Sequence, residues 1–439
     1  MLRGLWAKVQ GAGVAALVAR GSSAALVIKT IGVALQLALH LSLTHLLPNV
    51  EQYGMYVYAI ALVRTAVLVA TLGFSKSSMR FVPQYLVEKD WGALAGFLRR
   101  VPPLVTLTSL ALIALAGAVT VITGSPFADT TLTLAILACI LLPVRSLLEV
   151  GAGCLRGFKQ IVAPLSSNNI ARPAAILVIF GCLYSFDVEL TAAMAMAINL
   201  AVVAGIVALL YYLLARTTPS EARSAESEPQ MRYWIAASLP FLLLTGFSSL
   251  SKQIDLIMVG SLLGGESAGL YSVASRVAMF LGIPLGSVNS ILAPVVAQLH
   301  HEKKHTELQQ AVTMATRITF SMTLVGGGLV WFFGDQVLAL FGEQYASGAL
   351  GCLRILVFGQ LVNAAAGSVG LLMAMTGNQL QATLVVGGSV LLNVVLNLVL
   401  VPHFGIEGAA IATAIALAAW NIVLILRVRK ILGIRALAH

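Results

Sequence analysis

The chain has 439 residues, of which 59% are hydrophobic and only 10% carry a charged side chain. Its mean hydropathy is +0.93. This composition excludes a water-soluble domain and predicts an integral membrane protein. Apolar runs of about twenty residues recur along the chain, whereas a β-barrel would show short alternating segments, so we expect an all-α protein.

Twelve apolar segments are long enough to cross a bilayer as helices, which takes about twenty residues each. The residues before the first segment hold basic side chains among small ones and lack a compact apolar core with a cleavage site. They predict a short interfacial helix and no cleavable signal peptide. The twelve segments are residues 22–46, 53–76, 101–123, 130–154, 163–185, 188–214, 234–262, 267–298, 311–333, 349–375, 382–402 and 408–426.

Lysine and arginine outside these segments fall on one side of the predicted membrane. With the N-terminus in the cytoplasm, 19 of the 27 basic residues lie in cytoplasmic segments, and the external loops hold acidic residues instead. This asymmetry predicts that both termini are cytoplasmic and that the number of spans is even. The net charge of +10 is therefore explained by the membrane topology, and it does not predict nucleic-acid binding.

A polar segment halfway along the chain, residues 216–232, is rich in serine and glutamate and contains proline. Such a composition predicts a flexible cytoplasmic linker. It would join an N-terminal six-helix lobe, residues 1–215, to a C-terminal six-helix lobe, residues 233–439.

Matching residues recur in the two halves at similar offsets. Gly54 and Gly269 are 215 residues apart, and Pro83 and Pro294 are 211 residues apart. An even number of spans in each copy would make the copies parallel. We therefore expect two lobes related by a pseudo-two-fold axis along the membrane normal, with binding sites between them.

Eight basic side chains lie within the predicted spans. Facing lipid without partners, they would cost about 20–28 kcal/mol in total, at about 2.5–3.5 kcal/mol each. This exceeds the stability of most folds, about 5–15 kcal/mol, so most of them must face protein, water or an interface. The eight are Lys29, Arg64, Arg145, Arg172, Lys252, Arg276, Arg317 and Arg354.

Four of these cations lie toward the middle of matching spans. Lys29 and Lys252 are on spans one and seven, and Arg64 and Arg276 are on spans two and eight. This arrangement predicts a cationic cavity between the lobes that binds an anionic group. The alternative is that each cation pairs with a carboxylate or extends to the interface.

Two further charged residues are candidates for the same site. Arg172 follows a polar stripe, residues 166–169, and is a candidate for lining a cytoplasmic vestibule. Lys252 and Asp255 are three residues apart and would share one face of a continuous helix. Asp255 then either neutralises Lys252 or takes up a proton or sodium ion in a coupled cycle.

Other polar residues in the spans have structural interpretations. Arg145 and Glu149 are four residues apart and predict an internal ion pair. The sequence contains no catalytic motif, phosphate-binding loop or metal-ligand spacing, so we expect no enzyme, cofactor or metal. Four asparagines are expected to form interhelical hydrogen bonds: Asn363, Asn393, Asn397 and Asn421.

Several segments resemble one transporter family. The segments 46–56, 79–85, 375–378 and 392–413 are similar to the first external loop, the end of span two and the final hairpin of the polysaccharide transport family. These are the bacterial oligosaccharide flippases of the multidrug/oligosaccharidyl-lipid/polysaccharide exporter superfamily. The resemblance covers nearly the whole chain and says nothing about which sugar is carried.

The resemblance implies a fold and a substrate. It implies twelve helices in two bundles, alternating access, and a substrate built on a polyprenyl diphosphate. It also implies that basic residues on spans one, two and eight hold the diphosphate. Lys29, Arg64 and Arg276 stand on those spans.

Three functional hypotheses follow. The first is a flippase of the bacterial inner membrane that moves lipid-linked oligosaccharides to the outer leaflet for O-antigen, capsule or exopolysaccharide assembly, with polymerase and chain-length proteins as partners. The second is an ion-coupled drug or metabolite antiporter, although exporters of cations favour acidic cavities. The third is a membrane polymerase or ligase, which needs a large basic external loop that the sequence lacks.

Overall fold

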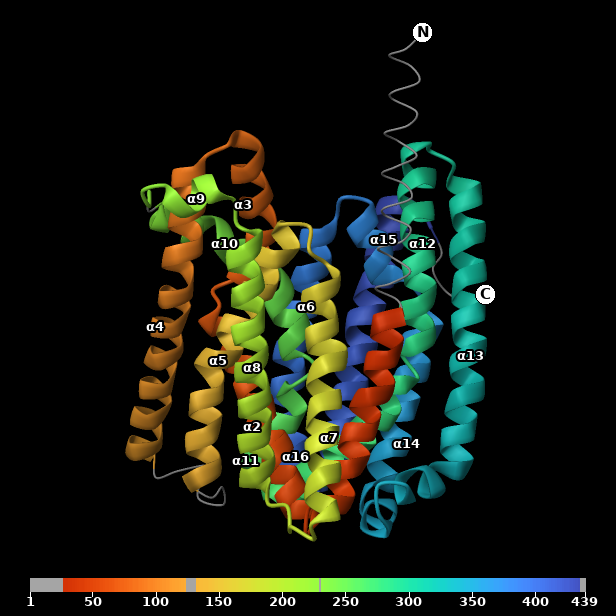
Figure 1. Ribbon diagram of the computed structural model, residues 1–439. Coiled ribbons are helices and arrows are strands. Elements are labelled where there is room, and N and C mark those ends of the chain that lie inside the picture. Colours follow the sequence, from red (N-terminus) through yellow and green to blue (C-terminus); the bar gives the residue numbers. More distant parts are fainter. Residues whose placement is uncertain (1–26, 124–131, 229, 435–439) are drawn as a thin grey trace. The chain divides into compact units, whose positions relative to one another are not determined.

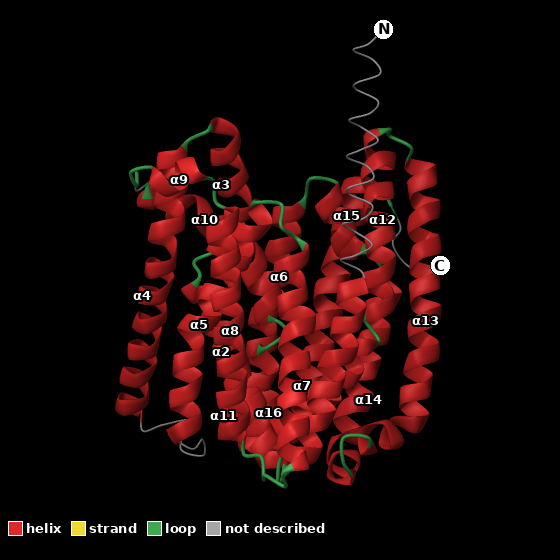
Figure 2. Cartoon of the chain, viewed as in Figure 1, coloured by secondary structure: helices red, strands yellow, loops and turns green. Residues whose placement is uncertain are grey.

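The computed structural model describes residues 27–123, 132–228 and 230–434, and every regular element in them is a helix (Figures 1 and 2). Nine helices in these ranges are long and apolar enough to cross a membrane. The prediction of an all-α, multi-span protein is confirmed, whereas the count of twelve spans stays a prediction. The expected interfacial helix before residue 22 lies outside the described residues.

The chain forms two compact units. Unit 1 comprises Met1–Leu46, Ala66–Gly124 and Leu132–Leu243. Unit 2 comprises Leu47–Thr65, Ser125–Thr131 and Leu244–His439. The division into lobes at residues 216–232 stays a prediction.

The helices follow one another with short connections (Figure 1). A first helix, Val27–Leu46, precedes the labelled ones. Next come α2 (Val50–Ala70), α3 (Phe74–Glu88), α4 (Trp91–Thr123), α5 (Leu132–Gly157), α6 (Val162–Ser166), the π-helix η1 (Ser167–Ala171), α7 (Arg172–Ser185), α8 (Ala192–Thr217), α9 (Ser220–Ser224) and α10 (Met231–Leu250). The rest are α11 (Ile254–Phe280), α12 (Ile283–His301), α13 (His305–Ala339), α14 (Glu343–Ala366), α15 (Val369–Met375) and α16 (Gln379–Leu432).

The long helix α11 is a hairpin of two helices. Gly264 has φ 86° and ψ −175°, outside the helical region. Asp255 and Tyr271 interact through their side chains although sixteen residues separate them. A continuous helix would hold them about 24 Å apart at 1.5 Å per residue, so the chain reverses at Gly264.

The 54-residue helix α16 reverses in the same way. Gly405 has φ 59° and ψ −140°. A Cβ atom on Gly408 would lie 2.3 Å from the carbonyl oxygen of Leu400, eight residues earlier. In a continuous helix these residues would be about 12 Å apart, so only a tight turn at Gly405 explains the contact.

Several predicted spans are interrupted rather than continuous. The span predicted at 53–76 ends at Ala70 and resumes at Phe74, with Leu72 and Gly73 at positive φ between them. The span predicted at 234–262 breaks in a turn at residues 251–253. Irregular backbone inside a membrane is tolerated only where protein or a water-filled cavity surrounds it.

The aromatic core of unit 1 joins α3, α4 and α10. Trp234 is fully buried, and its Nε1 donates a hydrogen bond of 2.7 Å to the hydroxyl of Tyr85. The ring of Phe97 contacts Trp234 edge-on at 5.4 Å, and Phe81 packs on both Phe97 and Tyr85. These contacts place α10 against α3 and α4.

The segment 216–232, predicted to be flexible, is instead packed on α4. It includes the short helix α9, in which Ala222 is buried. The guanidinium of Arg99 donates to the carbonyl oxygens of Arg223 and Ala225, and the backbone N–H of Glu228 donates to Gly92. The polar composition did not reveal these backbone acceptors, which carry the packing.

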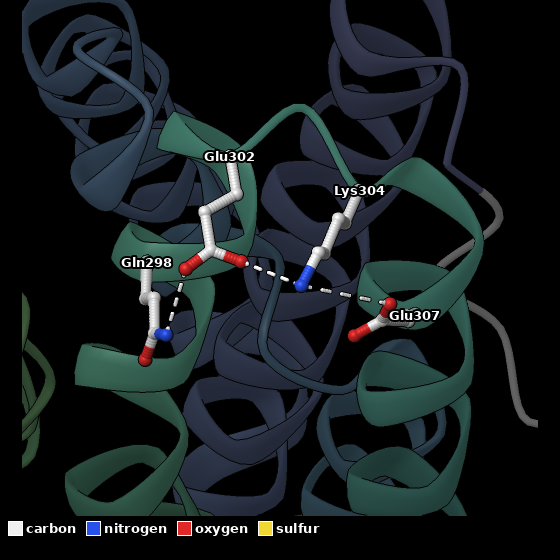
Figure 3. Close-up of polar contacts among 4 residues, drawn as sticks. All are labelled: Gln298, Glu302, Lys304 and Glu307. Carbon is white, nitrogen blue, oxygen red and sulfur yellow. Dashed lines mark hydrogen bonds and ion pairs between the residues drawn. The ribbon is translucent and has the colours of Figure 1, made fainter.

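A small charge network lies between α12 and α13 (Figure 3). Lys304 is 2.9 Å from Glu302 and 3.9 Å from Glu307, and Gln298 donates to Glu302 at 2.8 Å. The hydrogen bond from Gln298, followed by the contact with Lys304, lowers the pKa of the Glu302 carboxyl. Local acids therefore offset part of the basic charge of this loop.

Candidate functional site

Asp255 is the buried acid of unit 2, and asparagines of α16 hold it. It is 7% exposed. The Nδ2 atoms of Asn393 and Asn397 donate to its Oδ1 at 2.9 and 3.0 Å. The hydroxyls of Tyr271 and Thr413, 3.3 Å from each other, lie close enough to Asp255 to interact with it. The result is a polar cluster formed by the two hairpins α11 and α16.

The sequence left two alternatives for Asp255, and the first of them, neutralisation of Lys252, is wrong. Lys252 lies in the turn 251–253, outside α11, and is exposed, whereas Asp255 is buried in the first turn of α11. No ion pair joins the two in the described part of the chain. The break in the helix removes the shared face on which the prediction rested.

The prediction that these asparagines form interhelical hydrogen bonds is confirmed. Asn421 donates to the Oδ1 of Asn363 at 3.0 Å, joining α16 to α14. Asn393 and Asn397 also bond between helices, but their partner is Asp255, which was not among the expected acceptors. The sequence did contain a feature that could have predicted this contact. It is the pair of asparagines one turn apart on an apolar helix, together with an acid on another helix.

Arg64 and Arg276 both belong to unit 2. The α2 residue Gly54 touches Gly265 at the start of the second arm of α11. Arg64 lies on α2, ten residues beyond Gly54, and Arg276 lies on the second arm of α11, eleven residues beyond Gly265. Both side chains are half-buried.

Glycine residues let α2 pack closely on α11. A Cβ on Gly54 would lie 1.7 Å from the carbonyl oxygen of Gly265, and a Cβ on Gly269 would lie 2.6 Å from that of Val50. The ring of Tyr58 occupies the space beside Gly260, and its hydroxyl is 2.9 Å from Ser261 Oγ. Only glycine lets the two backbones approach so closely.

Arg276 is a cation with an unsatisfied donor. Its Nε is buried and has no hydrogen-bond acceptor among the described residues. Its helix continues only to Phe280, where Leu281 and Gly282 interrupt the path to α12. A buried donor without a partner is costly, so this position favours an anionic ligand or water.

Lys29 and Arg172 belong to unit 1. Lys29 is exposed near the start of the helix Val27–Leu46. Arg172 is 5% exposed and begins α7. A Cβ on Gly32, one turn after Lys29, would lie 2.8 Å from the Cβ of Asn169 in η1, so the first helix and the π-helix touch one turn from both cations.

A small polar pocket of about 100 Å³ opens beside these residues. Glu149 is one of its lining residues and makes no ion pair or hydrogen bond to another described residue, so the predicted pair with Arg145 is wrong. Spacing alone had assigned Glu149 to Arg145, and the pocket was missed. Its polar lining residues are Glu149, Arg156, Asn168 and Asn169.

The structure therefore groups the predicted site residues by unit. Arg64, Arg276 and Asp255 lie in unit 2, and Lys252 lies at a helix break three residues before Asp255. Lys29 and Arg172 lie near the polar pocket of unit 1. The convergence of both groups on one cavity stays a prediction.

The fold is that of a known transporter superfamily. The chain superposes on an inward-facing multidrug resistance MATE family transporter of the MOP superfamily with a TM-score of 0.73, covering 91% of this chain and 98% of that one at 15% identity. A MatE family model also matches residues 240–399. The chain thus has the multi-helix membrane fold of this transporter.

The family can be stated more narrowly. A model described as "Polysaccharide biosynthesis protein" matches residues 18–300, and the chain belongs to this family. It is 28% identical over 172 residues to the "Probable low-salt glycan biosynthesis flippase Agl15" of Haloferax volcanii, covering 38% of this chain and 35% of that protein. It is 23% identical over 191 residues to the capsular polysaccharide biosynthesis protein CapF of Staphylococcus aureus, covering 41% and 45%. The chain spans less than half the length of these curated relatives.

Proposed function

We propose that this protein moves polyprenyl-diphosphate-linked oligosaccharides from the cytoplasmic to the outer leaflet of a bacterial inner membrane by alternating access. The observation that supports the proposal is the pair Arg64 and Arg276, two half-buried cations of unit 2 on helices that are long and apolar enough to cross a membrane. Cations at mid-membrane depth are expensive unless they serve a polar ligand or water. A diphosphate is such a ligand.

Each site residue has a role in this proposal. Lys29, Arg64, Lys252 and Arg276 contact the diphosphate, and Arg172 lines the cytoplasmic vestibule. The helix breaks at residues 251–253 and 281–282 keep the backbone near these cations open to a wet cavity. The membrane potential assists, because moving one negative charge outward gains about 2.3 kcal/mol per 100 mV.

The relatives support the substrate class. Agl15 is named as a probable glycan biosynthesis flippase, and CapF is named for capsular polysaccharide biosynthesis. We infer the same class of substrate for this chain, in the service of O-antigen, capsule or exopolysaccharide assembly. Both termini would be cytoplasmic, and a polysaccharide polymerase and chain-length proteins would act on the product.

Asp255 is proposed as the ion-coupling residue. Its carboxylate is surrounded by the oxygen-bearing side chains of Asn393, Asn397, Tyr271 and Thr413. The Oδ1 of Asn397 is buried without a hydrogen-bond partner, as expected of an oxygen that can turn to a cation. Transport by Asp255→Asn should lose its dependence on the proton or sodium gradient, and an unchanged dependence would exclude the role.

The decisive experiment removes the two arginines together. In a strain lacking this gene, Arg64→Ala with Arg276→Ala should abolish surface polysaccharide at normal protein level, and single lipid-linked repeat units should accumulate on the inner leaflet. The control is Arg429→Ala with Lys430→Ala, which removes two exposed cations near the end of α16. Full activity of the double arginine variant would end the proposal.

The alternative is an ion-coupled antiporter of drugs or metabolites, which the likeness to a multidrug MATE structure favours. Ethidium efflux from cells that express the protein separates the two. Efflux that depends on Asp255 and survives the loss of Arg64 and Arg276 would establish the antiporter instead.

A further inference from the structure

We propose that the polar pocket between α5, α6–η1 and α8 in unit 1 binds the hydroxyl edge of a sugar ring. This inference rests on the proposed function and deepens it, because it assigns a place to the glycan rather than to the diphosphate. The pocket is lined by Glu149, Arg156, Asn168 and Asn169, with apolar side chains around them.

The donors and acceptors of the pocket fit a neutral, hydroxyl-bearing ligand. A carboxylate accepts hydrogen bonds, a guanidinium donates them, and an asparagine amide does both. Glu149 and Arg156 are two helical turns apart on α5, about 10 Å, and no ion pair joins them. A free cation would meet Arg156 and a phosphate would meet Glu149, whereas vicinal hydroxyls can satisfy both.

The polar groups of the pocket still have capacity for a ligand. Neither Glu149 nor the Asn168 amide makes a hydrogen bond to a described residue, and Asn169 uses only its Nδ2, on the carbonyl of Leu165 at 2.8 Å. Arg156 uses its Nε on the carbonyl of Ala152 at 3.1 Å. Polar groups without protein partners favour water or a polar ligand, so the pocket suits a polar occupant.

The backbone of η1 explains why the amides face this space. Pro173 has no N–H, so the carbonyl four residues earlier, that of Asn169, loses its helical donor. The N–H of Arg172 instead reaches back five residues to the carbonyl of Ser167. Single π turns of this kind are frequent at functional sites.

The position of the pocket suits a sugar attached to a diphosphate. Asn169 packs against Gly32, and Lys29, a proposed phosphate ligand, lies one turn from Gly32. Phosphate and first sugar are covalently linked, so their binding sites must be neighbours. A volume of about 100 Å³ admits a few waters or the edge of one ring, not an oligosaccharide.

The test compares two ligands on the full-length protein in nanodiscs. One is the lipid-linked glycan extracted from the host's own deletion strain, and the other is undecaprenyl diphosphate, which has no sugar. Wild-type protein should bind the glycan lipid more tightly. Glu149→Gln and Asn168→Ala should reduce that preference by roughly tenfold, the factor for about 1.4 kcal/mol, and leave the affinity for undecaprenyl diphosphate unchanged.

The controls separate the possible failures. Glu343→Gln, at an exposed acid that begins α14, should keep the preference. Retained binding of undecaprenyl diphosphate shows that a variant is folded, and Asn168→Ser replaces Asn168→Ala if it does not fold. A preference that survives in the pocket variants, or no preference in the wild type, overturns the sugar subsite. Failure of the wild type to bind either lipid overturns the proposed function itself.

Discussion

Asp255 in unit 2 and Glu149 in unit 1 both lie on apolar helices, and their surroundings differ. Asp255 in unit 2 is buried and accepts hydrogen bonds from Asn393 and Asn397. Glu149 in unit 1 faces a pocket and has no hydrogen bond to any described residue. Because a buried polar group is costly unless it is bonded, the first acid is satisfied by the fold and the second needs an occupant.

Because of this difference, we expect mutation of the two acids to have opposite effects on stability and on ligand binding. Loss of Asp255 leaves amides of the protein without an acceptor, so stability should suffer. Loss of Glu149 leaves no protein group unsatisfied, so stability should hold while ligand binding suffers. Each prediction below tests one side of this contrast.

The largest effect is expected from Asp255→Ala. Removing the carboxylate leaves two buried amide donors unsatisfied, at about 1–3 kcal/mol each. The free energy of unfolding in detergent should fall by about 2–4 kcal/mol. Glu149→Ala should change it by less than about 1 kcal/mol. Equal losses of unfolding free energy in Asp255→Ala and Glu149→Ala would contradict the difference described between the two acids.

We expect the same contrast, with smaller changes in stability, between Asn397 in unit 2 and Asn168 in unit 1. Asn397 is fully buried and donates both to Asp255 and to the carbonyl of Asn393. Asn397→Ala should therefore lower stability by about 1–3 kcal/mol. Asn168→Ala, with no bond to lose, should be near neutral. Thermal unfolding of both variants, measured side by side, checks this prediction. A larger loss of stability in Asn168→Ala than in Asn397→Ala would show that the assignment of the two environments is wrong.

The smallest effect is expected at an acid in the loop before α13. Gln298 and Lys304 lower the folded-state pKa of Glu302, so its stabilisation is present above the unfolded pKa and is lost as pH falls through the folded one. Glu302→Gln should lower the melting temperature slightly at pH 7, and the difference should vanish in acid. The group is exposed, so a large shift would contradict its superficial position.

Much of the architecture was predictable because lipid imposes a simple rule. Every backbone group inside a membrane must be bonded within the protein, so long apolar segments become helices, and their lengths reveal them. The composition predicted an all-α membrane protein, and the segments 46–56 and 392–413 indicated the family. Helix breaks were not predicted, because Leu72, Gly73 and the turn 251–253 are short interruptions inside segments whose average composition is apolar.

The candidate site was predictable only in part. Arg64 and Arg276 were identified from their depth along their spans, a quantity that counting residues supplies. The partner of Asp255 was not, because Asn393 and Asn397 are 138 and 142 residues away from it in the chain. The pairs Lys252–Asp255 and Arg145–Glu149 failed because sequence spacing predicts a contact only where the helix is continuous and no other group competes.

The sequence by itself determined the class of protein, the approximate positions of its spans and the presence of cations among them. These follow from local hydrophobicity, which each segment carries on its own. Tertiary structure alone decided which polar groups are satisfied, since the reversals at Gly264 and Gly405 bring Asp255, Tyr271, Asn397 and Thr413 together. Whether a charge in a membrane is structural or waits for a ligand depends on such distant partners.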